Sequence, residues 1–90
     1  MKLLVEIDLT NADLTLFEAY ERAVLTLLPE HGGRLEARVR SLDGAREHHL
    51  IAWGDAAGYA AYRNDPRRLA LSDDWAQCGA RASVVEVADV

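Results

Sequence analysis

The chain turns at His31-Gly32-Gly33-Arg34-Leu35-Glu36-Ala37-Arg38-Val39-Arg40, a stretch that joins a predicted helix to a predicted strand. Its paired glycines are typical of a helix C-terminus, because glycine adopts the left-handed conformation that ends many helices. After them, apolar and charged residues alternate, which is the period of two of a β-strand. One predicted face carries Leu35, Ala37 and Val39, and the other carries Arg34, Glu36, Arg38 and Arg40. The stretch therefore predicts a strand whose two faces differ in polarity.

Upstream of this stretch lie a predicted strand and a predicted helix. Apolar and polar residues alternate over Lys2–Leu9, as in a strand with one apolar face. From about Leu14 to Leu28 the apolar residues recur at helical spacing, and Pro29 ends the helix because it lacks an amide hydrogen. The residue that caps the start of this helix is Thr10, Asn11 or Asp13. Charged residues off the apolar stripe are Glu18, Glu21 and Arg22.

Downstream, Asp43-Gly44 predicts a hairpin turn between strands 34–42 and 47–53. Asp55 then caps a second helical segment, which breaks near Asn64 and restarts at Asp65-Pro66, since proline suits the first position of a helix. This segment runs to about residue 79, and residues 82–87 form a last strand. The order predicts one domain over residues 1–90, a ferredoxin-like α+β fold. Its four-stranded antiparallel sheet carries both helices on one face.

Two helices cover only one face of such a sheet. The face predicted to be covered carries the apolar side of the first strand with Leu35, Ala37, Val39, Val85 and Val87. The open face gathers Leu4, Glu6, Asp8, Arg34, Glu36, Arg38, Arg40, Val84 and Glu86. Antiparallel sheets tolerate a solvated face, which is one interpretation. The interpretation that we favour is a second subunit packed on this face, which also enlarges the small core of a 90-residue chain.

Composition argues against several classes of partner. The chain has 15 acidic and 10 basic residues and a net charge of −5, which disfavours binding to nucleic acid or to an anionic membrane. Its single cysteine, Cys78, excludes an intrachain disulfide, and no cysteines and histidines have zinc-finger spacing. Two acids interrupt the first apolar run, so a signal peptide is not predicted. A cytoplasmic setting is the resulting expectation.

Three segments resemble one protein family: His31-Gly32-Gly33-Arg34, Glu47–Trp53 and Tyr59–Pro66. They look like the small bacterial domains of domain-of-unknown-function family 1330. That family belongs to the dimeric α+β-barrel superfamily, which also holds the antibiotic-biosynthesis monooxygenases. The chain departs from the resemblance at Trp53, where such sequences often have phenylalanine, and in its short Ser41–Arg46 loop. The resemblance implies a ferredoxin-like subunit and a homodimer whose sheets face each other.

The histidines are the candidate chemical groups. His48 and His49 are adjacent on a predicted strand, so they point to opposite faces and cannot bind one ion together. His31 stands at a helix end, where a structural role is favoured. His49 shares a face with Glu47, and a histidine beside a carboxylate can act as a general base at neutral pH. A place in a cross-strand charge network is the simpler interpretation of the same pair.

Three functions remain as alternatives. The favoured one is a homodimeric α+β barrel that holds a small organic ligand between sheet and helices. The second, which the resemblance implies, is a cofactor-independent monooxygenase or isomerase for a small aromatic or lactone. Its candidate catalytic residues are His49, Arg38 and Tyr62. Haem handling is a variant that Trp53 and the histidines permit. The third is a structural interaction module. Neither a cofactor nor a metal ion is predicted.

Overall fold

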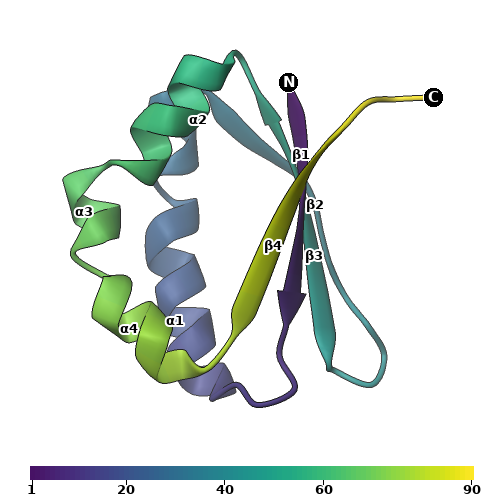
Figure 1. Ribbon diagram of the computed structural model, residues 1–90, viewed down its shortest axis with the longest axis vertical. Coiled ribbons are helices and arrows are strands. Elements are labelled where there is room, and N and C mark those ends of the chain that lie inside the picture. Colours follow the sequence, from purple (N-terminus) through teal and green to yellow (C-terminus); the bar gives the residue numbers. More distant parts are fainter.

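The computed structural model describes residues 1–90 as two layers, an antiparallel sheet and a layer of helices on one of its faces (Figure 1). The strands are β1 (Lys2–Asp8), β2 (Gly33–Arg40), β3 (Arg46–Trp53) and β4 (Arg81–Val87). The helices are α1 (Leu14–Leu25), the short 3₁₀ helix η1 (Leu28–His31), α2 (Ala56–Arg63), α3 (Pro66–Leu69) and α4 (Ser72–Cys78). The strand order is β2-β3-β1-β4, with every neighbouring pair antiparallel. The predicted ferredoxin-like fold is confirmed.

Short polar side chains start the helices as the sequence predicts. Asp13 caps α1, Asp55 caps α2 and Asp65 caps α3, each with its carboxylate accepting a hydrogen bond from a backbone amide of the first turn. Gly32 ends η1 with a φ of 76°. Beyond Asp65 the structure has two short helices instead of the single predicted one. The hydroxyl of Ser72 donates to the carbonyl of Leu69, and such a bond competes with a continuous helix.

The largest departure from the predicted fold is a β-bulge in β2. The register against β3 shifts between Leu35 and Ala37, so β2 contains one extra residue there. A shift of one residue moves every later side chain to the opposite face. Arg38 and Arg40 therefore lie on the face that the helices cover, where both contact Glu18 of α1. Their predicted place on the open face is wrong, because alternation in the sequence carries no sign of an added residue.

Several valines on β2 and β4 lie on the face opposite to the predicted one. Val39, beyond the bulge, is 58% exposed on the open face. On β4, Val84 pairs with Val5 on the covered face, whereas Val85 pairs with Leu4 on the open face. The prediction that Val85 and Val87 are covered is wrong, because apolar residues occupy both faces of β4 and their pattern does not mark the buried side.

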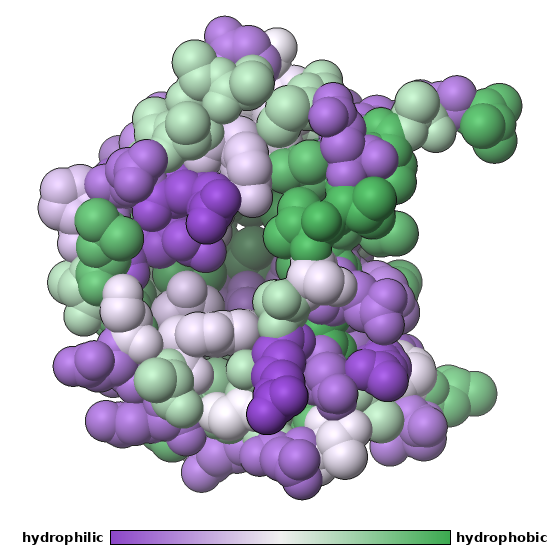
Figure 2. Space-filling view, viewed as in Figure 1, coloured by the Kyte–Doolittle hydropathy of each residue, from purple (hydrophilic) through white to green (hydrophobic).

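Two clusters of apolar side chains form the core between sheet and helices. The larger cluster joins β1, β3, α1 and α2, and the smaller one is centred on Phe17, which is fully buried. Helix α2 approaches η1 closely, since a Cβ atom on Gly58 would lie 2.3 Å from the carbonyl oxygen of His31. The packing leaves a hollow between the two layers (Figure 2).

Candidate functional site

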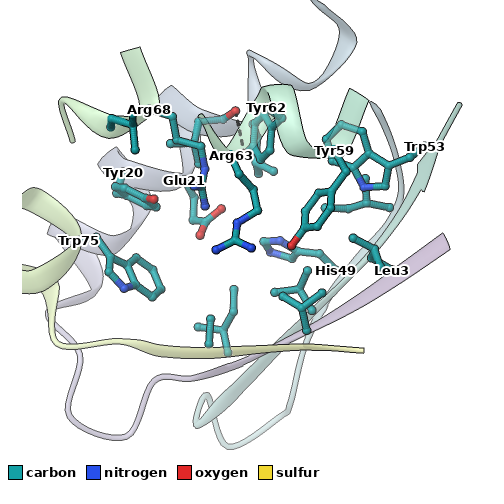
Figure 3. A pocket seen from close by; sticks show the side chains of 18 of the residues that line it. Leu3, Tyr20, Glu21, His49, Trp53, Tyr59, Tyr62, Arg63, Arg68 and Trp75 are labelled. Carbon is teal, nitrogen blue, oxygen red and sulfur yellow. Dashed lines mark hydrogen bonds between the residues drawn. The ribbon is translucent and has the colours of Figure 1, made fainter. Parts of the chain in front are cut away.

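The hollow is a cavity of about 320 Å³ between the covered face of the sheet and the helices (Figure 3). Residues of β1, β3, β4, α1, α2, α3 and α4 line it, and 14 of the 19 are hydrophobic. This volume lies at the lower end of the range for small-molecule sites, which are concave and mostly apolar with a few polar groups. The cavity is therefore the candidate site.

Aromatic rings form two walls of the cavity. Trp53 of β3 packs at ring-centroid distances of 5.4 Å from Tyr59 and 5.3 Å from Tyr62, both on α2. On the other side, Tyr20 of α1 packs 5.0 Å from Trp75 of α4. Aromatic rings offer large, stiff apolar surfaces, so these walls suit a flat or aromatic ligand body.

His49 and Glu47 form a hydrogen-bonded pair at the floor of the site. The distance between His49 Nε2 and Glu47 Oε2 is 2.6 Å, and both side chains are buried. Burial lowers the pKa of His49, and this effect outweighs the opposing attraction of Glu47. A neutral His49 that donates from Nε2 has its lone pair on Nδ1. No protein group bonds to Nδ1, and His49 lines the cavity, so this nitrogen is a free hydrogen-bond acceptor for a ligand.

The carboxylate of Glu47 is held by two arginines as well as by His49. Arg38 Nε donates to Glu47 at 3.0 Å, and Arg40 donates from Nε at 2.9 Å and Nη2 at 2.6 Å. Burial alone would raise the pKa of Glu47, but the hydrogen bonds from His49, Arg40 and Arg38 outweigh it and lower that pKa. Glu47 therefore stays ionised and keeps the ring of His49 in one orientation. The β-bulge makes this possible, since it turns both arginines toward Glu47.

The other residues predicted as candidates take different positions. Arg38 does not line the cavity and acts on it through Glu47. Tyr62 lines the cavity, but its hydroxyl donates to the carbonyl of Val24 at 3.2 Å, and burial raises its pKa to about 12. Its ring therefore belongs to the wall, and its hydroxyl proton stays in place. His49 is the predicted residue that presents a free polar atom.

Glu21 is a site residue that the sequence interpretation missed. Its side chain on α1 lines the cavity with 5% exposure, and no hydrogen bond or ion pair joins its carboxyl group to another side chain. Burial raises its pKa to about 7. The spacing contains a signal for it, because Phe17, Glu21 and Val24 fall on one helical face and all three are buried. A carboxyl at such a position is a polar group that lacks a partner within the protein.

The remaining histidines lie outside the cavity. His48 faces the opposite side of the sheet from His49, as predicted, and its Nε2 is 3.7 Å from Glu6. His31 ends η1 and is 2.8 Å from Asp65, which joins η1 to the start of α3. No group of three or more His, Cys, Asp or Glu side chains is positioned to hold a metal ion. No helix combines the length and hydropathy that a membrane crossing requires.

Comparison with solved structures identifies the class of fold. SnoaB, a cofactor-independent oxygenase from Streptomyces nogalater, aligns over 99% of this chain and 93% of its own, with a TM-score of 0.75 and 11% identity. Atu4242 from Agrobacterium tumefaciens aligns over 98% and 94%, with a TM-score of 0.69 and 18% identity. A dimeric ferredoxin-like protein of unknown function from Jannaschia sp. CCS1 aligns over 97% and 100%, with a TM-score of 0.69 and 15% identity.

The chain thus shares the ferredoxin-like fold of these solved structures, and the predicted resemblance to dimeric α+β-barrel proteins is confirmed at the level of the fold. No protein-family model matches the chain, and a search of curated proteins finds no match. One fold of this kind supports many unrelated activities, so function has to be argued from the cavity and from the open face of the sheet.

Proposed function

We propose that the protein is a homodimer that binds a small organic ligand, with a flat or aromatic body, between the sheet and the helices of each subunit. The observation that carries this proposal is the apolar cavity, which is lined by the aromatic walls and by His49, whose Nδ1 has no partner in the protein. A ligand with one hydroxyl or other donor group would bond to this nitrogen while its body displaces water from the aromatic walls. Apolar burial supplies affinity in such a site, and the single polar contact fixes orientation.

The open face of the sheet supports the proposed homodimer. Its middle row is apolar and crosses all four strands through Ala37, Leu50, Leu4 and Val85. Charged residues lie at both ends of the strands and neutralise one another: Lys2 and Arg34 with Glu36 at one end, and Arg46 with Asp8 at the other. A second copy would bury the apolar row without leaving these charges unpaired.

Substitution of Val85 by aspartate is expected to dissociate the dimer. The side chain is 55% exposed on the edge strand β4, at the end of the apolar row of the open face. In a symmetric dimer each subunit would bury one such aspartate in the interface. The dissociation constant should rise about 100-fold or more, measured by sedimentation equilibrium. Leu16→Asp is the control, because Leu16 is exposed on α1, away from the sheet. A wild-type protein that is monomeric at about 100 µM would contradict the proposed dimer.

Filling the mouth of the cavity is expected to abolish ligand binding. Val84 lines the cavity from β4 and is 48% exposed, so a tryptophan there has room to enter the opening without disturbing the core. Phenylnaphthylamine, a neutral aromatic probe whose fluorescence rises in apolar sites, should bind the wild type and lose about tenfold or more in affinity in Val84→Trp. Leu16→Trp adds the same group outside the cavity and should bind normally. Equal binding by both variants would contradict the proposed site.

Proton abstraction from the ligand is a second candidate function. The observation that favours it is the Glu47–His49 pair, in which a carboxylate orients a neutral imidazole whose free nitrogen faces an apolar cavity. His49 would act as the general base, with Arg38 as a positioning residue through Glu47. This candidate requires the proton of His49 to reside on Nε2, which nitrogen NMR of the imidazole ring reports directly. If the proton resides on Nδ1 instead, this nitrogen has no free lone pair and His49 cannot act as the base toward a ligand in the cavity.

A further inference from the structure

We propose that the ligand carries one anionic group, a carboxylate or a sulfonate, which binds Arg63 and Arg68 at the mouth of the cavity. The proposal rests on the proposed function, because it names the chemical class of ligand that the cavity takes: an amphipathic acid with an apolar body. Arg63 belongs to the last turn of α2 and Arg68 to α3, so the two arginines follow each other along one rim of the opening.

These two arginines differ from the paired ones by lacking an acidic partner. Most arginines of the protein form ion pairs, namely Arg34, Arg38, Arg40, Arg46 and Arg67. Arg63 and Arg68 form none, although the chain has five more acidic than basic residues. Arg22 and Arg81 are also unpaired, but neither lines this cavity. Arg63 and Arg68 are thus the two unpaired arginines that line the cavity.

Aromatic rings hold the two guanidinium groups at the opening. The guanidinium carbon of Arg63 lies 5.8 Å from the ring centroid of Tyr59, and that of Arg68 lies 5.0 Å from the ring centroid of Tyr62. Both distances are within the range of cation–π attraction. In Figure 3 the side chain of Arg63 points into the cavity, and Figure 2 shows strongly hydrophilic residues on the helical side of the hollow. A ligand group entering here meets positive charge before it meets the aromatic walls.

Unsatisfied donors around the cavity indicate that the missing partner is an acceptor. Arg68 Nε is buried and has no hydrogen-bond partner, and the same holds for the indole nitrogen of Trp53. Both residues line the cavity. A buried N–H without a partner costs free energy, which an acceptor on a ligand would recover once the side chain turns toward the cavity. Guanidinium groups bind carboxylates and related oxyanions with especially strong hydrogen bonds, so an anionic acceptor fits best.

Glu21 links this anion site to pH. Its carboxyl is the one acid that lines the cavity, and the charged groups acting on it are Arg38, Arg68, Glu47 and Glu18. Because the pKa of Glu21 is about 7, a bound anion would favour its protonated form and also the protonated form of His49. Affinity for an anionic ligand should therefore fall as the pH rises through about 7, while a neutral ligand of the same shape should respond less.

Two fluorescent probes of nearly the same shape separate charge from apolar contact. Anilinonaphthalene sulfonate carries the anionic group, and phenylnaphthylamine has the same aromatic body without it. The wild type should bind the sulfonate more tightly. The double variant Arg63→Gln with Arg68→Gln should lose about tenfold or more for the sulfonate and change little for the neutral probe. Arg22→Gln with Arg81→Gln is the control, because it removes the same total charge elsewhere and should leave both affinities unchanged.

Arg68 also packs on Tyr62, so Arg63→Gln alone is measured beside the double variant, and circular dichroism checks that each variant is folded. An unchanged preference for the sulfonate in the folded double variant would overturn the inference. If the neutral probe still binds in that case, the proposed function stands. Failure of both probes to bind the wild type would overturn the proposed function and the inference together.

Discussion

Replacing Glu47 by alanine is expected to lower the free energy of unfolding by about 3–5 kcal/mol. Its carboxylate is buried and accepts hydrogen bonds from Arg38, Arg40 and His49. Without it, two guanidinium groups would face a largely buried site with Glu18 as their remaining counter-charge. Removing Glu47 costs more than the cluster contributes as a whole, because the buried His49 loses its partner and the two arginines keep only Glu18. Urea unfolding at neutral pH measures the loss.

Glu30→Ala is the matched control for this prediction. Glu30 also pairs with an arginine, at 3.1 Å from Arg67, but both side chains are more than half exposed. The cost there should stay below about 1 kcal/mol. Acid supplies a second check: the lowered pKa of Glu47 means that its contribution is present above the ordinary glutamate pKa and is lost as the pH falls through the lowered value. Equal losses in the two variants would contradict the assigned role of Glu47.

Much of the fold could be predicted because local chemistry decides it. Asp43-Gly44 makes the hairpin turn, and Asp55 and Asp65 accept bonds from the first amides of the helices that they cap. These contacts form within four residues, so the sequence shows them directly. The bulge near Glu36 depends instead on how β2 aligns with β3, which no local pattern encodes. One added residue was enough to reverse the predicted faces of Arg38 and Val39.

The candidate site, like the fold, could be predicted from the sequence only in part. The pairing of His49 with Glu47 could be predicted, since residues two apart on a strand share a face. The two arginines that complete the cluster could not, because they reach Glu47 only beyond the bulge. Glu21 is predicted to lie off the apolar stripe, because charged residues usually lie on the solvent side of a helix. Its spacing from Phe17 and Val24 places Glu21 on the buried side of α1. At this position helical spacing, and not the polarity of the side chain, predicts burial correctly.

Glu21→Gln is expected to stabilise the protein at alkaline pH. Burial raises the pKa of Glu21 from its ordinary value of 4.5 to about 7. The pKa of Glu21 is higher in the folded state than in the unfolded state. The neutral carboxyl therefore costs no stability below the unfolded pKa, and stability is lost as the pH rises through about 7. A pKa difference of this size lowers the free energy of unfolding by about 3 kcal/mol once the carboxyl group is ionised. Glutamine keeps the shape and cannot ionise, so the variant should avoid this loss.

Thermal or urea unfolding of both proteins, from about pH 5 to about pH 9, tests the sign and the pH at which the curves separate. The two curves should lie close together at the acid end, separate as the pH rises to about 7 and run parallel above it. Glu18→Gln, one turn earlier on α1, should lower the stability by a nearly constant amount over this range. Hydrogen bonding to Arg40 and attraction by Arg38 lower the pKa of Glu18, so its contribution is lost only at more acid pH. A constant difference across the range would show that Glu21 is not the titrating group. A carboxyl that costs stability at neutral pH while facing an apolar cavity is typical of a site adapted to a ligand, since a hydrophobic residue there would give the more stable protein.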